Sequence, residues 1–377
     1  MTTAFWIYTD VAVFCIALLL TGIIIPQILL IAFRRKLFDE VDERKVHKGV
    51  VPRLGGIAFL PAIIFSICLV LAVNISFDVI DISSVLGGAS KSILYLLCAQ
   101  MLIFLVGIAD DLIGVRYKAK FMAQIICAVF ICSAGAYISD LGGLLWIHQI
   151  PAWLGWCISG FIVVYLVNAI NLIDGIDGLA SGLSGIALIF YGIVLTISHQ
   201  WVLALLAWAQ LGTLVPFFYY NVFGNQKKQK KIFMGDTGAL TVGMLLSFIA
   251  LSITNIESVE ITHHYNKIIL AFSPLIIPGF DVVRVYFHRI RNHRNPFLPD
   301  KCHIHHKLLA LGISQRVSLC IILISAIIFM LVNILLSPYV AATWLVIADI
   351  AIWIIVNVLM TRAIRRKEQK QHQTLYD

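Results

Sequence analysis

Charged side chains are scarce in this chain of 377 residues. Asp, Glu, Lys and Arg together make up 13% of it, while 60% of the residues are hydrophobic. Soluble domains carry about 25% charged residues. The shortage of charge therefore excludes an ordinary soluble globular protein and predicts an integral membrane protein.

Other features of non-membrane classes are also missing. The eight cysteines are scattered, and all but Cys302 lie in apolar runs, so the chain has neither a disulfide framework nor a zinc ribbon. No Lys or Arg precedes the first apolar run, and no A-x-A-like cleavage site is evident there. These absences favour a retained membrane helix over a signal peptide.

Long uncharged runs account for most of the chain. A helix needs about 20 apolar residues to cross a hydrocarbon core of roughly 30 Å. About eleven runs approach that length: 10–33, 57–77, 92–109, 121–139, 152–170, 179–198, 201–220, 238–256, 267–287, 317–336 and 340–361. We therefore expect an all-α, polytopic membrane protein.

The basic residues predict the orientation of these spans. With the N-terminus outside and the C-terminus in the cytoplasm, the loops 34–56, 110–120, 171–178, 221–237 and 284–316 and the tail after 361 face inward. These segments hold 26 of the 28 Lys and Arg residues, and only Lys91 and Lys267 fall elsewhere. The positive-inside rule explains such a bias, so the net charge of +8 does not require nucleic-acid binding. We expect one transmembrane catalytic domain over 1–361 and a basic tail over 362–377.

The same alternation places every cluster of acids, amides and histidines at the cytoplasmic ends of helices. A secondary transporter would keep ionisable residues near the bilayer midplane, often with internal repeats. The chain shows no repeat and little midplane charge. A membrane enzyme facing the cytoplasm is favoured over a carrier.

The stretch "GIADDLIGVRYKAK" joins Asp110 and Asp111 to Arg116, Lys118 and Lys120. A solvated helix end with positive-inside charges would look similar. Adjacent carboxylates beside cations also suit a divalent metal that is shared with substrate phosphates. Both interpretations stay open for this stretch alone.

The stretch "NAINLIDGIDGLASG" spaces Asn168, Asn171, Asp174 and Asp177 by three residues, and its two Asp-Gly pairs predict turns. A plain polar connector before a closely packed helix is the alternative. Amides and carboxylates at the membrane surface can recognise a base or a sugar, which a connector does not need, so a binding role is favoured.

The stretch "KKIFMGDTGAL" ends a lysine-rich run and begins the eighth span with Asp236. The acid could simply cap the helix. A helix N-terminus is also a natural anion site, and a carboxylate beside phosphates would recruit a metal. Phe233 is suited to stacking on a flat base.

Two further loops are rich in cations. In "RIRNHRNPFLPDKCHIHHKLL", His303, His305 and His306 could bind zinc, but the surplus of donors favours a phosphate-binding loop, and a plain basic loop stays open. "VDERKVHKGVVPRLGG" contains Lys48 and is uninformative alone. Asp281 and Arg284 are spaced to form an ion pair.

In this order the motifs resemble the polyprenyl-phosphate N-acetylhexosamine-1-phosphate transferase family. The resemblance covers nearly the whole chain, through RKxHxxxxPRxGG at 44–56, Asp110-Asp111, NxxNxxDGxDG at 168–178, FMGD at 233–236 and HIHH at 303–306. The PDKCHIHH and VPRLGG segments are most similar to the branch that uses UDP-N-acetylglucosamine. Phospho-N-acetylmuramoyl-pentapeptide transferases of peptidoglycan synthesis, the nearest alternative, usually show a PTMGG-like segment and a triple histidine.

The resemblance implies transfer of N-acetylglucosamine 1-phosphate from UDP-N-acetylglucosamine to undecaprenyl phosphate, with release of UMP. It implies a multi-pass protein of the bacterial inner membrane with its site on the cytoplasmic face. The product would begin a cell-envelope polysaccharide of the O-antigen, enterobacterial-common-antigen or teichoic-acid type. Mg²⁺ is the expected cofactor; Mn²⁺ and a homodimer stay open.

Roles for individual residues follow from the same resemblance. Asp236 is expected to ligate the metal, with Asp110 and Asp111 supporting it and orienting the lipid phosphate. Such a phosphate is mostly dianionic at pH 7, which favours positioning over general-base catalysis. The expected nucleotide-sugar pocket comprises Lys48, Asn171, Asp174, Asp177 and Phe233. The expected phosphate ligands are Lys118, Lys120, Arg294, His303, His305 and His306.

Overall fold

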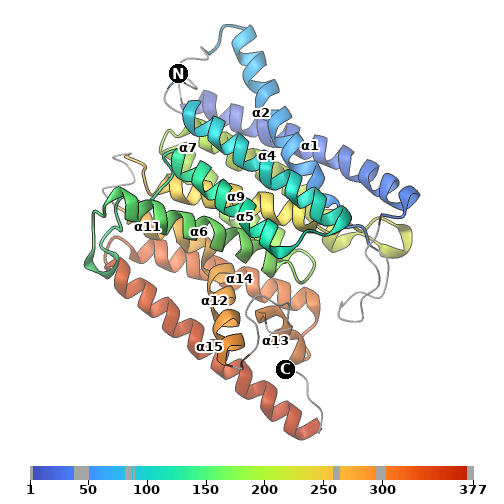
Figure 1. Ribbon diagram of the computed structural model, residues 1–377, viewed down its shortest axis with the longest axis vertical. Helices are drawn as coiled ribbons and strands as arrows, with labels where there is room; N and C mark the ends of the chain where they lie inside the picture. The colour runs from blue at the N-terminus through green and yellow to red at the C-terminus, as the bar shows by residue number, and fades with distance from the viewer. Residues whose placement is uncertain are drawn as a thin grey trace.

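The computed structural model describes residues 3–37, 51–80, 87, 90–257, 264–291, 293 and 303–371 (Figure 1). Over these residues the protein is helical, and the sole β-type pairing described is an isolated antiparallel bridge between Asp140 and Gln149. The expectation of an all-α fold is confirmed.

Long helices run back and forth through the described part of the chain. In order they are α1 (Thr3–Arg35), α2 (Phe59–Ser76), α4 (Ser90–Ile113), α5 (Tyr117–Ser133), α6 (Ala152–Ile173), α7 (Leu179–Ile197), α8 (Trp201–Phe218), α9 (Gly235–Ile253), α12 (Ile276–Arg291), α14 (Gln315–Leu336) and α15 (Ala342–Gln371). Shorter helical segments are η1 (Gly55–Ala58), η2 (Leu144–Trp146), the π-helical η3 (Tyr219–Phe223), η4 (Gln226–Lys228), α11 (Lys267–Phe272), η5 (Ser273–Leu275) and α13 (Ile304–Ala310).

Ten helical segments among the described residues are long and apolar enough to cross a membrane, which makes the chain a multi-pass membrane protein. The eleventh expected span, at 121–139, is not among these ten segments. In its place lies α5, a helix of 17 residues that begins at Tyr117 and ends at Ser133. At 1.5 Å per residue α5 is about 25 Å long. The expected span at 267–287 is built from α11, η5 and α12, with Pro274 at the junction.

Helix α9 forms the centre of the bundle and is buried along almost all of its length. It packs against α4, α6, α7 and α11, and Figure 1 shows it enclosed between these elements. A helix with no exposed face cannot shift without disturbing its neighbours, because protein interiors are close-packed. Whatever lies at the first turn of α9 is therefore held firmly.

The two ends of the bundle differ in what they carry. At one end, polar contacts join Ser92 to Ala134, Asn266 to Gly142 and Thr343 to Gly143, so the segment between α5 and α6 ties several helix ends together. The predicted motifs meet at the other end, as described below. The described parts of these motifs share one end; which side of a membrane this end faces stays a prediction.

The entry to α2 lies directly on α9. A Cβ atom added to Gly56 would stand 2.1 Å from Gly238 Cα, so the two backbones touch where any other residue would force them apart. Two backbone bonds strengthen the contact, from Gly55 N to Phe233 O (3.0 Å) and from Gly56 N to Met234 O (2.9 Å).

We expect Gly56→Ala to lower the thermal stability of the purified protein, because overpacking a tight contact costs about 1–3 kcal/mol. Gly160→Ala is the matched control, since its new methyl group would meet only Ala128 Cβ at 4.0 Å. Melting of both variants in detergent checks this. Equal melting temperatures for Gly56→Ala and the parent would contradict the described contact.

Candidate active site

The carboxylate of Asp111, near the end of α4, holds the first turn of α9. Its oxygens accept hydrogen bonds from the backbone N–H groups of Asp236 (2.7 Å) and Thr237 (2.9 Å) and from the Thr237 hydroxyl. The first N–H groups of a helix have no partner within the helix, and an acid from another segment satisfies them here. Asp111 thereby sets the position of Asp236.

Lys120, in the first turn of α5, bridges the other two acids. Its Nζ lies 2.9 Å from Asp110 Oδ2 and 2.8 Å from Asp236 Oδ2. The second oxygen of Asp236 accepts a hydrogen bond from Asn171 Nδ2 at 3.1 Å. Lys118 is exposed. Residues two apart on a helix point to different faces, so only one of the two lysines meets the acids.

The donor set around Lys120 suits a divalent cation. Two carboxylates already converge on one positive nitrogen, and hard oxygen donors are what Mg²⁺ prefers. In the described part of the chain, no group of three or more His, Cys, Asp or Glu residues could hold a metal. Mg²⁺ usually takes one or two carboxylates and completes its shell with water and substrate phosphates. Asp110 and Asp236 fit that pattern.

Asp174 and Asp177 lie on the loop between α6 and α7. Asp174 is exposed and interacts electrostatically with Arg53 and Asp236. The carboxylate of Asp177 pairs with Lys231, and both side chains are largely buried. Nζ of Lys231 also lies 5.9 Å from the ring centroid of Phe233. Lys231 thus joins Asp177 and Phe233, two of the residues predicted to bind the nucleotide sugar.

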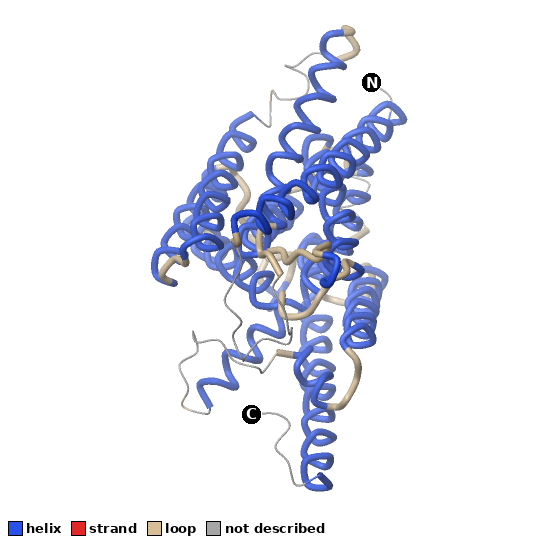
Figure 2. Tube along the Cα trace, turned by 90° about the vertical axis from the view of Figure 1, so that its right-hand side faces the viewer, coloured by secondary structure: helices blue, strands red, loops and turns tan. Residues whose placement is uncertain are grey.

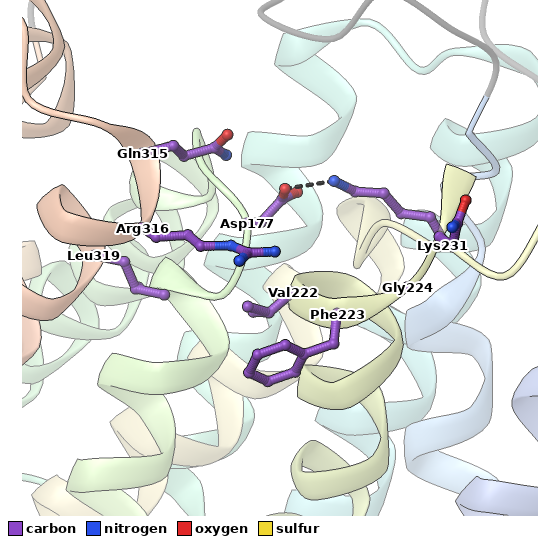
Figure 3. Close-up of a pocket in the computed structure, with 9 residues that line it drawn as sticks. Asp177, Val222, Phe223, Gly224, Lys231, Gln315, Arg316 and Leu319 are labelled. Atoms are coloured by element: carbon purple, nitrogen blue, oxygen red, sulfur yellow. Dashed lines mark hydrogen bonds and ion pairs between the residues drawn. The ribbon is translucent and has the colours of Figure 1, made fainter. Parts of the chain in front are cut away.

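A polar pocket of about 380 Å³ opens beside the Asp177–Lys231 pair (Figure 3). It lies between the α6–α7 loop, the end of η3 and the start of α14. Figure 3 shows Arg316 and Lys231 extending toward Asp177 from opposite sides. The lining residues are Asp177, Val222, Phe223, Gly224, Asn225, Lys231, Gln315, Arg316 and Leu319.

The histidines lie on and before the short helix α13. His303 Nδ1 donates to Asp281 Oδ2 (2.8 Å), and Asp281 also pairs with Arg284 (2.8 Å), which confirms the predicted ion pair. His305 is buried against the backbone of Gly175, because a Cβ there would stand 2.2 Å from its Nε2. The ring centroids of His305 and His306 are 4.1 Å apart.

The predicted site residues therefore divide into groups. Asp110, Asp111, Asn171, Asp236 and Lys120 form one connected cluster at the N-terminus of α9. Asp177 and Phe233 meet through Lys231, and His305 contacts the loop that carries Asp174 and Asp177. Lys118 is exposed away from the acids. Lys48 and Arg294 lie outside the described residues.

Some residues at the site were not predicted to belong to it. Thr237 and Lys231 adjoin predicted motifs, so their nearness was a usable signal. Arg316 and Asn225 give no such signal, because a cation or an amide in a loop at the membrane surface is ordinary. Only the folding of α14 and η3 toward Asp177 brings these two to the pocket.

Comparison with known proteins shows the family of this chain. The family profile described as glycosyl transferase family 4 matches residues 93–254. A Bacillus subtilis (strain 168) protein named probable undecaprenyl-phosphate N-acetylglucosaminyl 1-phosphate transferase is 31% identical over 346 residues, which span 92% of this chain and 89% of that protein. The chain belongs to glycosyl transferase family 4.

Two other relatives carry the name undecaprenyl-phosphate alpha-N-acetylglucosaminyl 1-phosphate transferase. The Yersinia pestis protein is 29% identical over 81% of this chain and 78% of its own length. The Escherichia coli (strain K12) protein is 30% identical over 77% of this chain and 74% of its own length. The region matched by the family 4 profile contains the clustered acids, whereas His303, His305 and His306 lie beyond it.

The burial of His305 predicts that the stability of this family 4 protein depends on pH. Removal from water, followed by the nearby His306 and His303, lowers the pKa of His305 to about 3. An unfolded histidine has a pKa near 6.5. Below that pH the unfolded chain binds a proton that the folded chain does not. His305 therefore leaves the free energy of unfolding unchanged above about pH 6.5. Below that pH it lowers the free energy of unfolding, by at most about 1.4 kcal/mol per pH unit.

We expect the melting temperature to drop between pH 7 and pH 5, and to drop less in His305→Gln, which has no such proton to bind. His148→Gln is the control, because His148 is exposed at the opposite end of the bundle. A parent-like pH dependence in His305→Gln would show that this histidine is not the responsible group.

Proposed function

We propose that this family 4 protein transfers N-acetylglucosamine 1-phosphate from UDP-N-acetylglucosamine to undecaprenyl phosphate and releases UMP. The observation that carries the proposal is the pair Asp110 and Asp236, bridged by the ammonium of Lys120 where membrane-spanning helices end. Oxygen donors and a cation at such a place suit phosphoryl transfer to a lipid. The names of the relatives supply the sugar and the acceptor.

The location of the site supports a reaction between a lipid and a soluble donor. The phosphate of undecaprenyl phosphate lies at the membrane surface, and a nucleotide sugar is dissolved in the cytoplasm. Both can reach helix ends that meet water, and neither could reach acids at the middle of the bilayer. We assign this end of the bundle to the cytoplasmic face of the bacterial inner membrane.

Phosphoryl transfer depends mainly on positioning and on neutralising charge. A Mg²⁺ ion held by Asp110 and Asp236 would neutralise the diphosphate of the donor. An oxygen of the lipid phosphate forms a bond to the β-phosphorus, and the bond from that phosphorus to the bridging oxygen breaks, so UMP leaves with the bridging oxygen. Because the lipid phosphate is mostly dianionic at pH 7, Asp110 acts by orienting it and not by removing a proton.

The surrounding residues are assigned to positioning Asp236 and to binding the substrates. Asp111 holds Asp236 in place through the backbone of α9. The ammonium of Lys120 can leave the two carboxylates and bind a substrate phosphate. Lys118 is assigned to phosphate binding together with Lys120. The nucleotide sugar is assigned to Asn171, Asp174, Asp177, Phe233 and Lys48. The diphosphate is assigned to His303, His305, His306 and Arg294.

We expect Asp236→Asn to reduce UMP release by at least 100-fold while leaving a folded protein, because an amide weakens metal binding and cannot pair with Lys120. The measurement uses purified protein, undecaprenyl phosphate, Mg²⁺ and UDP-N-acetylglucosamine. EDTA should abolish release and added Mg²⁺ should restore it. UDP-N-acetylmuramoyl-pentapeptide should give none.

Asp140→Asn is the matched control for this assay. Asp140 lies at the opposite end of the bundle, so the Asp140→Asn variant should retain the parental turnover. Activity of Asp236→Asn within about threefold of the parent, a change under 1 kcal/mol in the barrier, would remove Asp236 from the metal site.

The assigned orientation predicts which surfaces a membrane-impermeant thiol reagent reaches. In a background without the native cysteines, Lys228→Cys should be labelled only from the cytoplasmic side and His148→Cys only from the outside. Both residues are exposed and they lie at opposite ends of the bundle. Labelling of Lys228→Cys in intact cells would reverse the orientation.

A further inference from the structure

The position of the histidine helix is not set by the helix itself. α13 has only 7 residues, and isolated helices shorter than about 12 residues are marginal in water. Its place depends on the elements that hold it. Three polar attachments are described, one near its start, one in its middle and one at its end, and the helix also packs against α14.

The first attachment comes from α12. Asp281 Oδ1 accepts the backbone N–H of Ile304 at 3.0 Å, and Asp281 Oδ2 accepts from His303 Nδ1 at 2.8 Å. This acid fixes the start of α13, and it leaves the helix able to pivot about that point unless its other end is also held.

The second attachment comes from α15, the last helix. Nζ of Lys307 lies 3.1 Å from Asn357 Oδ1, 3.1 Å from Thr361 Oγ1 and 3.4 Å from the carbonyl oxygen of Asn357. Lys307 is 5% exposed and Asn357 is 6% exposed. A buried ammonium is costly unless its donors are bonded, and here three acceptors from one helix surround it. Lys307 therefore cannot leave α15 without losing that compensation.

The third attachment is farther along the same helix, where Lys367 Nζ lies 3.3 Å from the carbonyl oxygen of Ala310. With 30 residues α15 is about 45 Å long, more than a hydrocarbon core of roughly 30 Å requires. Its C-terminal part extends beyond the bundle (Figures 1 and 2), and α15 lies beside α13 in Figure 1. Asn357 and Thr361 lie within roughly the first 30 Å of α15, and Lys367 on the extension adds the contact to the end of α13.

We propose that α15 is a positioning element of the active site, in which Asn357 and Thr361 hold Lys307 and so press His305 against the loop at Gly175. The proposal rests on the proposed function, because it assigns the histidines to the diphosphate. His305 has no room to shift toward Gly175. A displacement of α13 would therefore move both the histidines and the loop that carries Asp174 and Asp177. Misplacement of about 1 Å can cost roughly 100-fold in rate.

The test compares variants on the two sides of this contact. Lys307→Met and Asn357→Leu should each lower kcat at least tenfold, with the KM for undecaprenyl phosphate within twofold of the parent. The kcat of the double variant should be no lower than that of the less active single variant, because both changes break the same contact. Asn357→Asp keeps an acceptor for the ammonium and should retain activity within threefold.

A matched control loosens α15 elsewhere. Asn333 Nδ2 donates to Asp349 Oδ2 at 2.8 Å, and both residues are buried between α14 and α15 away from α13. Asn333→Leu combined with Asp349→Leu removes this contact without leaving an unpaired group. It should retain the parental kcat even if the melting temperature falls. Losses that follow the melting temperature across all variants would reduce Lys307 to a stabilising role and overturn the proposal.

Hydrogen exchange makes the inference independent of the assay. Without substrate, amides of 303–311 should exchange at least tenfold faster in Lys307→Met than in the parent and stay slow in the Asn333/Asp349 control. Unchanged exchange in Lys307→Met, or turnover of Lys307→Met and Asn357→Leu within threefold of an active parent, overturns the proposal. A parent that releases no UMP from UDP-N-acetylglucosamine would refute the proposed function, and the exchange of 303–311 would still decide whether α15 holds α13.

Discussion

The bond between one carboxylate and the start of one helix underlies the arrangement of this site. Asp111 occupies the N-terminus of α9, and α9 is buried along nearly its whole length. Asp236 is the second residue of that helix, so its position is inherited from the core of the bundle. An acid on a loop would have several positions available, whereas this one has the rigidity of the most enclosed element in the fold.

The same end of α9 is approached closely by other backbones. Gly107 of α4 and Gly56 of η1 both lie where a side chain would collide with α9. The absence of side chains lets the segment before α2 form backbone bonds with 233–234 and still leaves Asp111 in reach of Thr237. Close packing and the placement of the acids are therefore one requirement.

Four of the acids described at this end of the protein have a cationic partner, whereas Asp111 is held by the N–H groups that begin α9. Lys120 serves Asp110 and Asp236, Lys231 serves Asp177, and Arg284 serves Asp281. Uncompensated charge at the edge of a membrane would be expensive, and pairing lowers that cost.

Most of the membrane-spanning helices and the gathering of the acidic motifs at one end of the bundle follow from the amino-acid sequence alone. A hydrocarbon core demands about 20 apolar residues whatever the neighbouring helices are, so the pattern is local and can be recognised without a fold. Once the spans are known, their alternation brings Asp110, Asn171 and Asp236 to one end. The sequence also pointed to the pairing of Asp281 with Arg284, because one helical turn separates them.

Other features were decided only by the tertiary structure. That Lys120 and not Lys118 meets the acids depends on the rotation of α5 against α4 and α9. That Asp111 binds a helix N-terminus while its neighbour Asp110 faces Lys120 depends on how α4 is turned. Lys307 looks like one more cation in a basic loop until α15 comes to lie beside it. These relations join residues far apart in the chain, and helix rotation is set by the packing of many side chains at once, which no local pattern encodes.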